Sequence, residues 1–267
     1  MEQVTSRNNP LIRRFREVAR ASRIGSTVLL DGPHLLEEAL RSRIELQVVA
    51  FTESAAARHA PLVQRCRQAA ARIITVPDTL GEAISPVRTA SGIVALASLA
   101  PSTLESVIAA ESPQLIVVLE SVQDPGNVGA VIRTSEACGG TGVIIGPGSA
   151  DPLGWKALRG SMGSALRLPI AVSQNLHDAV KALRAAGIRT FAAVPRNGSA
   201  PYRAKLHGPS AILLGGEGAG LEAALIEAAD ETVTIEMRPP VESLNVAVAA
   251  ALMLYEASRQ RADVTVR

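Results

Sequence analysis

Aromatic side chains are scarce in this chain, which has 267 residues but only 2% Phe, Trp and Tyr. Apolar residues still make up 47% of it, so the interior must be built from Ala, Val, Leu and Ile. Proteins that bind single-stranded nucleic acid without sequence preference stack bases on aromatic rings, and the composition argues against that mode of binding. The length favours two domains over one.

Cysteine is equally rare, and the two thiols, Cys66 and Cys138, lie far apart in helical, apolar contexts. They predict buried thiols in a reducing compartment and exclude a disulfide framework or a zinc site. The N-terminal sequence MEQVTSRNNP has no apolar signal core, and the uncharged stretch at 244–255 is too short to span a bilayer. We therefore expect a cytoplasmic protein without a membrane segment.

Almost all of the basic residues are arginines and few are lysines. The positive charge is unevenly distributed along the chain. Residues 1–104 hold 13 Arg and no Lys against 9 Asp and Glu, whereas the remainder has 14 basic and 16 acidic residues. A solvated surface is the plain interpretation of such an excess. Its position favours a phosphate-contacting arm, because six arginines crowd a predicted helix and its flanks within the first 25 residues. They are Arg7, Arg13, Arg14, Arg16, Arg20 and Arg23.

The first part of the chain alternates between predicted strands and helices, which indicates a small α/β domain. A first helical segment is expected within residues 1–25, further helices at 33–41 and about 54–71, and strands near 26–30, 46–51, 72–76 and 92–97. The stretch APSTLESVIAAESPQ, residues 100–114, has two prolines and small polar residues around a short helix, so it is the best candidate linker. The predicted domains are therefore 1–104 and 105–267.

Short aliphatic runs recur in the second part, and helical patterns separate most of them: LIVVLE, GVIIG, RLPIAV, RTFAAV, AILLGG and TVTIEM. Runs without polar alternation suit strands that are covered on both faces. We expect a mainly parallel sheet with helices on each side, and ligands beyond the carboxyl ends of its strands.

A lone arginine, Arg133, stands in the otherwise apolar or small-residue helix pattern DPGNVGAVIRTSEACGG that follows the first of these runs. An arginine carries five donors and stays charged, so something anionic is expected nearby. Asn127 falls where the strand has ended and the helix begins, within reach of a ligand there. The open alternative is that Asn127 only caps the helix and Arg133 only pairs with a structural carboxylate.

Two further segments place polar groups after strands. In AILLGGEGAGLEAAL, the glycines Gly215, Gly216, Gly218 and Gly220 permit close backbone approach around Glu217. The spacing matches neither a dinucleotide fingerprint nor a P-loop, and a plain helix-entry turn stays open. In IEMRPPVESLN, Ser243 and Asn245 flank Leu244 before a strongly apolar helix, although capping needs only one of them.

Read in order, DPGNVGAVIRT, LLGGEGAGL and IEMRPPVESLNVAVAAALMLYE closely resemble motifs one to three of the SpoU, or TrmH, class of RNA 2'-O-ribose methyltransferases. The segment LRGSMGSALRLPI, with Ser161, Gly163 and Pro169, resembles a family segment too. The N-terminal SRNNPLIRRFREVARASR and STVLLDGPHLLEEAL are similar to the family's substrate-binding extension. The chain departs from the usual motifs at Gly216, at Ala247 and at Met162.

The resemblance implies a trefoil-knotted, parallel-sheet SPOUT domain behind a smaller ribosomal-protein-like α/β domain that binds RNA, working as a homodimer without metal. It implies S-adenosylmethionine as cofactor, held by Val194, Gly215, Gly216, Glu217, Gly218, Ile235, Met237, Leu244 and Asn245. By carry-over, Arg133 is the main catalytic residue, Asn127 positions the ribose or phosphate, Glu217 orients the arginine, and Ser243 with Asn245 completes the pocket. Arg7, Asn9, Arg13 and Arg14 are the expected RNA contacts.

The expected reaction is methyl transfer to a ribose 2'-hydroxyl of structured RNA, with 23S ribosomal RNA favoured over transfer RNA. A catalytically silent RNA-binding or ribosome-assembly protein is the alternative from another class. The intact set of five polar motif residues argues against it.

Overall fold

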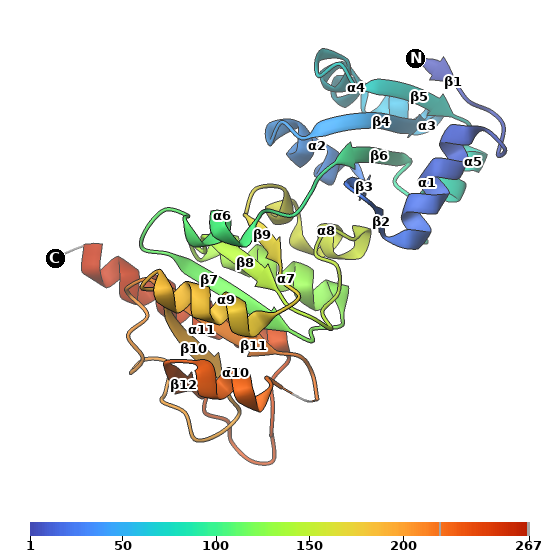
Figure 1. Cartoon of the computed structure of the whole chain (residues 1–267). Coiled ribbons are helices and arrows are strands. Elements are labelled where there is room, and N and C mark those ends of the chain that lie inside the picture. Colours follow the sequence, from blue (N-terminus) through green and yellow to red (C-terminus); the bar gives the residue numbers. More distant parts are fainter. Residues whose placement is uncertain (219, 266–267) are drawn as a thin grey trace. The chain divides into compact units, whose positions relative to one another are not determined.

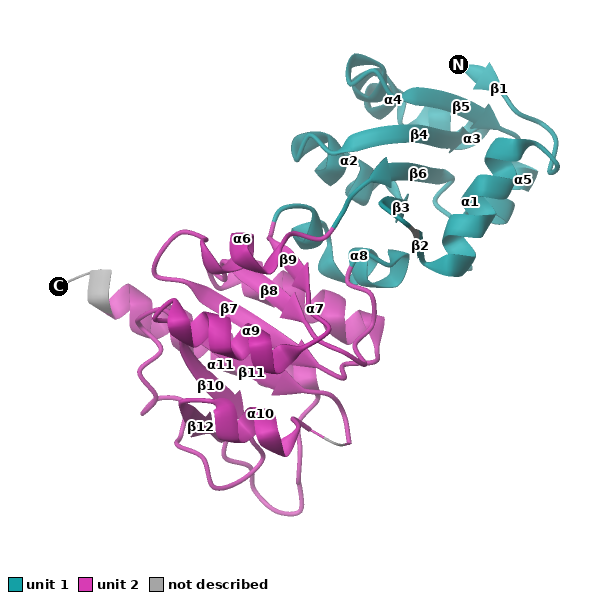
Figure 2. Ribbon diagram, in the orientation of Figure 1, with its two compact units in different colours: residues 1–100, 153–167 teal, residues 101–152, 168–267 magenta. Residues whose placement is uncertain are grey.

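The computed structural model describes residues 1–218 and 220–265 of the chain (Figure 1). Two compact units make up the chain, and each is coloured separately in Figure 2. Residues 1–100 and 153–167 form the first unit, and 101–152 with 168–267 form the second. These units differ from the predicted domains, 1–104 and 105–267, mainly in one segment, because residues 153–167 make their contacts within the first unit.

The first unit contains the mixed sheet of the N-terminal half, which confirms the predicted α/β fold. Its elements are β1 (Glu2–Gln3), α1 (Pro10–Ala21), β2 (Arg23–Ile24), β3 (Thr27–Asp31), α2 (Pro33–Arg41), β4 (Glu45–Thr52), α3 (Glu53–Arg58), α4 (Ala60–Gln68), β5 (Arg72–Val76), α5 (Asp78–Ile84), β6 (Ile93–Ser98), α8 (Trp155–Ser161) and the 3-10 turn η1 (Ser164–Leu166). The strands follow the order β1-β5-β4-β6-β3-β2. Residues of α1 and α5 pack on one side of this sheet around Phe15 and Ile84.

The single helix expected at 54–71 is wrong, because the structure has two helices there, α3 and α4. His59 takes a non-helical conformation between them, with φ −113° and ψ 37°. Pro61 has no N–H group to continue a helix and lies in the first turn of α4, where none is needed.

The segment 153–167 contacts four earlier positions of the first unit, which are Ala19, Asp31, His34 and Glu38. Trp155 donates its ring N–H to the carbonyl of Ala19, 3.1 Å away, at the end of α1. Arg159 faces the buried carboxylate of Asp31 at 4.0 Å, and His34 hydrogen-bonds to the carbonyl of Met162. The guanidinium of Arg167 forms an ion pair with Glu38, on α2. This segment is therefore an integral part of the first unit.

The second unit contains the sheet predicted from the aliphatic runs, and its strands pair in parallel as expected. Its elements are α6 (Leu104–Ile108), β7 (Leu115–Glu120), α7 (Pro125–Ala137), β8 (Gly142–Ile145), β9 (Ile170–Val172), α9 (Leu176–Ala185), β10 (Arg189–Ala193), β11 (Ser210–Gly215), α10 (Ala223–Ala228), β12 (Glu231–Val233) and α11 (Val246–Thr265). The strand order is β12-β10-β11-β7-β8-β9.

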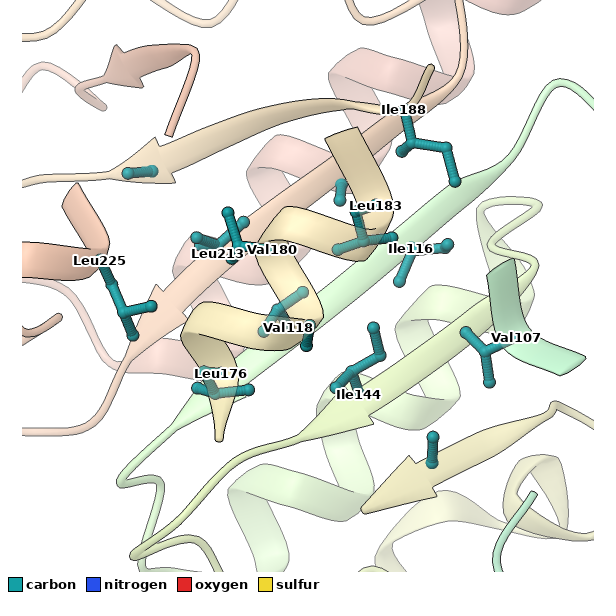
Figure 3. Close-up of a cluster of buried hydrophobic side chains, with 14 of the residues drawn as sticks. Val107, Ile116, Val118, Ile144, Leu176, Val180, Leu183, Ile188, Leu213 and Leu225 are labelled. Carbon is teal, nitrogen blue, oxygen red and sulfur yellow. The ribbon is translucent and has the colours of Figure 1, made fainter. Parts of the chain in front are cut away.

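Helices cover both faces of this sheet, which explains why its strands lack polar alternation. On one face, α6, α9 and α10 pack on alternate strand residues; Figure 3 shows Val180 and Leu183 of α9 over Ile116, Val118 and Leu213. On the other face, α11 contacts both α7 and β11. The stretch considered as a linker contributes α6, whose Val107 is completely buried in this core.

The cysteines differ in burial. Burial raises the pKa of the Cys66 thiol to about 11, despite the nearby Arg65, so this thiol stays protonated at neutral pH. Cys138, which was expected to be buried, is only partly so, at the end of α7. Within residues 1–218 and 220–265, no cluster of side chains is suited to hold a metal ion. Every helix in that part of the chain is too short or too polar to cross a bilayer.

Candidate active site

The three polar motifs meet because the strands before them end at one edge of the parallel sheet. The register pairs Glu120, the last residue of β7, with Gly215, the last residue of β11. Next to β11, strand β10 ends at Ala193, and β12, which pairs with β10, ends at Val233. Both strands therefore end at the same edge of the sheet. Side chains that follow these strands therefore gather at the carboxyl edge, as expected for a ligand site in such a sheet.

Asn127 does not cap helix α7, so the structural alternative for this residue is wrong. The cap is Asp124, whose carboxylate accepts the N–H of Asn127 at 2.9 Å, and Pro125 fills the first position of the helix. The amide side chain of Asn127 is free to point elsewhere. It donates to the carboxylate of Glu217, 2.8 Å away.

Glu217 is the centre of a polar cluster that joins all three motifs. Its Oε1 atom accepts from Asn127 and, at 3.0 Å, from the Nδ2 atom of Asn245. The same Nδ2 atom also lies 3.2 Å from Oδ1 of Asn127. Asn245 in turn caps α11, because its Oδ1 accepts the N–H of Ala247 at 2.9 Å. One asparagine thus fixes both a helix terminus and a carboxylate.

Arg133 lies outside this cluster, contrary to the expectation that Glu217 would orient it. It is exposed, whereas Val131, Ile132 and Ser135 around it are buried, so it occupies the outer face of α7. Six residues at about 100° per residue turn it about 120° around the helix from Asn127. Among the described residues, Arg133 has no hydrogen-bond or ion-pair partner, and the alternative of a structural ion pair therefore finds no support.

A cavity of about 360 Å³ opens beside Glu217 and contains every predicted cofactor residue except Asn245 in its lining. The predicted members are Val194, Gly215, Gly216, Glu217, Gly218, Ile235, Met237 and Leu244, and Ser243 also lines it. Sequence reasoning missed the other walls, which come from strand ends and the helices behind them: Ala193, Pro195, Leu214, Gly220, Leu221, Ile226, Val233, Val246 and Ala249. Of the described lining residues, Glu217 alone is ionisable.

The departure at Gly216 has a physical reason in this chain. A Cβ atom added there would lie 1.9 Å from the carbonyl oxygen of Ser121, and one added at Gly215 would lie 2.1 Å from the carbonyl carbon of Gly220. The backbones after β7 and β11 therefore touch directly, and the N–H of Gly216 donates to the carbonyl of Glu120 at 2.7 Å. Any larger residue at 216 requires a different path for one of these loops.

Glu120 supports the same loop and was not singled out in the sequence. Its carboxylate accepts the N–H of Glu222 at 2.8 Å, just before α10 begins. The sequence feature that could have identified Glu120 is its position as an acidic residue at the end of the aliphatic run LIVVLE.

The residues expected to contact RNA lie in and before α1 of the first unit. Arg7, Arg13 and Arg14 are exposed, but the Nη2 atom of Arg14 already donates to Gln47 at 2.7 Å. Asn9 is the N-cap of α1, where its side chain accepts the N–H of Leu11.

Comparison with known proteins agrees with this geometry. Residues 114–255 match the SpoU rRNA methylase family, and residues 1–110 match the N-terminal domain of thiostrepton-resistance methylases. The chain is 31% identical over 259 residues to the 23S rRNA (guanosine(2553)-2'-O)-methyltransferase RlmP of Bacillus subtilis, covering 96% of this chain and 98% of the relative.

Solved structures show the same similarity. The S-adenosylmethionine-bound rRNA methyltransferase of Sinorhizobium meliloti has a TM-score of 0.85 at 25% identity, covering 97% of each chain. A structure solved for insight into the 2-OH methylation of C/U34 on tRNA has a TM-score of 0.51 at 30% identity. The match covers 58% of this chain and 98% of the other chain.

The chain belongs to the SpoU rRNA methylase family. The predicted class, an S-adenosylmethionine-dependent RNA 2'-O-ribose methyltransferase, is thereby confirmed.

Proposed function

We propose that this protein methylates a ribose 2'-hydroxyl of 23S ribosomal RNA. The observation that carries the proposal is the cluster of Asn127, Glu217 and Asn245 at the mouth of an apolar cavity. The full-length similarity to a 23S rRNA enzyme supports this substrate, whereas the tRNA-related structure corresponds to little more than half of the chain.

The cavity fits the cofactor by size and by chemistry. Ligand sites commonly have volumes of about 300–1,000 Å³ with mostly apolar walls, and Ile235, Met237 and Leu244 supply such walls for an adenine ring. The carboxylate of Glu217 suits a ligand with a positive centre. When bound, S-adenosylmethionine supplies a methyl group on a cationic sulfur.

The motif residues would position the attacking oxygen, which must approach in line while its proton leaves. Glu217 holds the amides of Asn127 and Asn245, and Oδ1 of Asn127, which already accepts from Asn245, would accept from a ribose hydroxyl with its second lone pair. Ser243 lines the cavity next to this group and, among the described residues, makes no hydrogen bond of its own. Its hydroxyl is therefore available to substrate.

Arg133 would bind the phosphate next to the reacting ribose. A guanidinium stays protonated in almost every protein setting, so its role is to hold the anion, and the phosphate or a water receives the proton. The exposed, unpaired state of Arg133 supports this role, because an RNA phosphate can reach it directly.

The first unit would dock the RNA through Arg7, just before α1, and through Arg13 and Arg14 on α1, with Asn9 fixing the start of this helix. Shape and phosphate contacts should matter more than base stacking. We include a cytoplasmic location in the proposal, because ribosomal RNA is the substrate proposed.

We include a homodimer and a trefoil knot in the proposal. Three apolar side chains on one face of α11 are largely exposed: Val248 (48%), Leu252 (46%) and Tyr255 (69%). They are spaced four and three residues apart, as in a helix that packs against a second copy. The trefoil knot rests on membership of the SpoU family.

The test is to incubate unmodified 23S rRNA transcript with the protein and labelled S-adenosylmethionine, and to map 2'-O-methyl groups by resistance to alkaline cleavage. Asn127→Ala should bind the cofactor normally but lose most methylation, because it removes the acceptor and not the cavity. Methylation of tRNA alone, or of neither RNA, would contradict the proposed substrate.

A further inference from the structure

The segment 153–167 changes the charge of the unit to which it belongs. It contains Lys156, Arg159 and Arg167 and no acidic residue. The first unit thereby has 16 Lys and Arg against 9 Asp and Glu, whereas the second unit has 11 against 16. A polyanion such as RNA is attracted to the first unit and repelled by the second, so its phosphates should contact mainly the first unit.

Two of the three cations in this segment are engaged within the protein. Arg159 and Arg167 each pair with a largely buried carboxylate of the first unit. Lys156 is exposed and, among the described residues, takes part in no hydrogen bond or ion pair. Its Nζ atom lies 5.5 Å from the centre of the Trp155 ring. Lys156 is therefore the cation of this segment that is available to a phosphate.

Helix α8 holds Lys156 on the surface of the first unit. The inner side of this helix is formed by Ala157, Leu158 and Ser161, which are all buried. Lys156 and Arg159 lie three residues apart on the opposite, exposed side. The position of Lys156 is thus fixed by the packing of the helix, although its ammonium is solvated.

The ring of Trp155 joins α8 to the end of α1 (Figure 1). Its N–H donates to the carbonyl of Ala19 at 3.1 Å, and the ring and Ala19 pack against the same hydrophobic core. Arg20 follows Ala19 in the chain, just as Lys156 follows Trp155, so this contact brings the two cations to the same part of the first unit. Arg20 is also exposed and has no hydrogen-bond or ion-pair partner within residues 1–218 and 220–265.

We infer that Lys156 and Arg20 form a second phosphate-binding site of the first unit, separate from Arg7, Arg13 and Arg14. The inference rests on the proposed function, because its ligand is the backbone of the RNA substrate. An ammonium binds phosphate as a point charge without reading bases, so the site contributes affinity and orientation. Lys156 lies within the methylase family match, residues 114–255, but its role is in RNA binding.

Filter binding of a 23S rRNA transcript to the full-length protein at several salt concentrations tests the site. Lys156→Gln removes the charge and should weaken binding about fivefold at low salt, with a slope of log affinity against log salt that is lower by about 1. Lys156→Arg should restore both values, because the charge is kept. Lys181→Gln is the matched control, since Lys181 is an exposed lysine on α9 of the acidic second unit, without an ion-pair partner among the described residues.

Methylation kinetics give an independent measurement. Arg20→Gln and Lys156→Gln should each raise KM for the rRNA about fivefold, in line with the loss of one phosphate contact. The kcat should stay unchanged, because neither residue lines the catalytic cavity. The Tm should also stay nearly the same, since neither side chain has a hydrogen bond or an ion pair to lose among the described residues.

Three results would overturn the inference while the wild type still binds and methylates 23S rRNA. Lys156→Gln could bind as tightly as the wild type, or Lys181→Gln could lose as much affinity, which would indicate an effect of net charge alone. A lower Tm with an unchanged salt slope would show that Lys156 only stabilises the ring of Trp155. A wild type that neither binds nor methylates 23S rRNA would instead contradict the proposed function, and the inference with it.

Discussion

Two arginines of the second unit, Arg133 and Arg261, show how differently one side chain can be used. Arg261, near the end of α11, donates to the carbonyls of Pro113, Gln114, Leu206 and Gly208, and burial lowers the pKa of its guanidinium. Arg133, on the outer face of α7, has no such partner among the described residues. A satisfied arginine holds segments of the chain together, whereas an exposed one without a partner is available for substrate.

Replacing Arg133 should have the largest effect of the substitutions that test this difference. Arg133→Ala should lower kcat/KM for RNA methylation about 10³-fold, as when a group that binds developing charge is removed, with an unchanged Tm. Arg133→Lys should recover only a small part, because an ammonium cannot bind a phosphate through two parallel N–H groups. Near-full activity of the lysine variant would show that bidentate binding is not its role.

Replacing Arg261 should have the opposite profile. Arg261→Met keeps an apolar stem but removes the donor to four carbonyls, of which those of Gln114 and Gly208 still accept from Ser210 and those of Pro113 and Leu206 lose their partner. The loss should cost about 3 kcal/mol of unfolding free energy. Thermal denaturation measures it, and Arg259→Ala on the same helix is the control. Arg259 pairs with Glu256 and Asp263 at the exposed surface, so its loss should barely change Tm. Equal shifts in Tm for the Arg261 and Arg259 variants would contradict the conclusion that Arg261 holds these segments together.

Asn245 allows the site and the fold to be separated in one residue. Asn245→Asp keeps the oxygen that caps α11 but places a second carboxylate against Glu217, now 3.0 Å from the amide nitrogen. Tm should change little, whereas methylation should fall about tenfold or more, because like charges at this distance repel. A variant as active as the wild type would show that the amide contact to Glu217 is dispensable.

The same contrast applies to the arginines of α1. Arg13→Ala should weaken RNA binding and lower the slope of log affinity against log salt by about 1, as for one lost phosphate contact. Arg14→Ala should do less, because the Arg14 side chain already donates to Gln47. Filter binding of a 23S rRNA transcript at several salt concentrations compares them, and a larger effect at Arg14 would reverse the assignment.

The smallest effect is expected at Asp230. Burial opposes its ionisation, but hydrogen bonds from Thr190 and the charge of Arg184 together lower the pKa of its carboxyl below the ordinary 3.8. A lowered folded pKa means that the charged form stabilises the fold above about pH 4, and that this stability is lost as the pH falls through the folded pKa. The Tm difference between wild type and Asp230→Asn should therefore be present at pH 7 and shrink at pH 3. A Tm difference that is the same at both pH values would show that Asp230 stabilises the fold through packing and not through its charge.

Aliphatic runs such as LIVVLE and AILLGG were enough to predict the parallel sheet, because strands buried on both faces leave that pattern in the sequence. The end of β12 was not predictable, since the run TVTIEM continues with Ile235 and Met237, which are apolar because they line a cavity. Likewise, the helical pattern could not place Arg133. Its exposure depends on which face of α7 meets the sheet and α11, a property of tertiary packing.

Residues 153–167 have a consequence for any effort to exchange substrate recognition between members of this family. A chimera that transplants only residues 1–100 would bring in foreign partners for Trp155, Arg159 and Arg167, and these would no longer match. With RNA bound by the first unit as proposed, recognition would be encoded in two pieces of sequence, separated by the motif at residues 124–134. Both pieces must be grafted together for a new specificity to arrive intact.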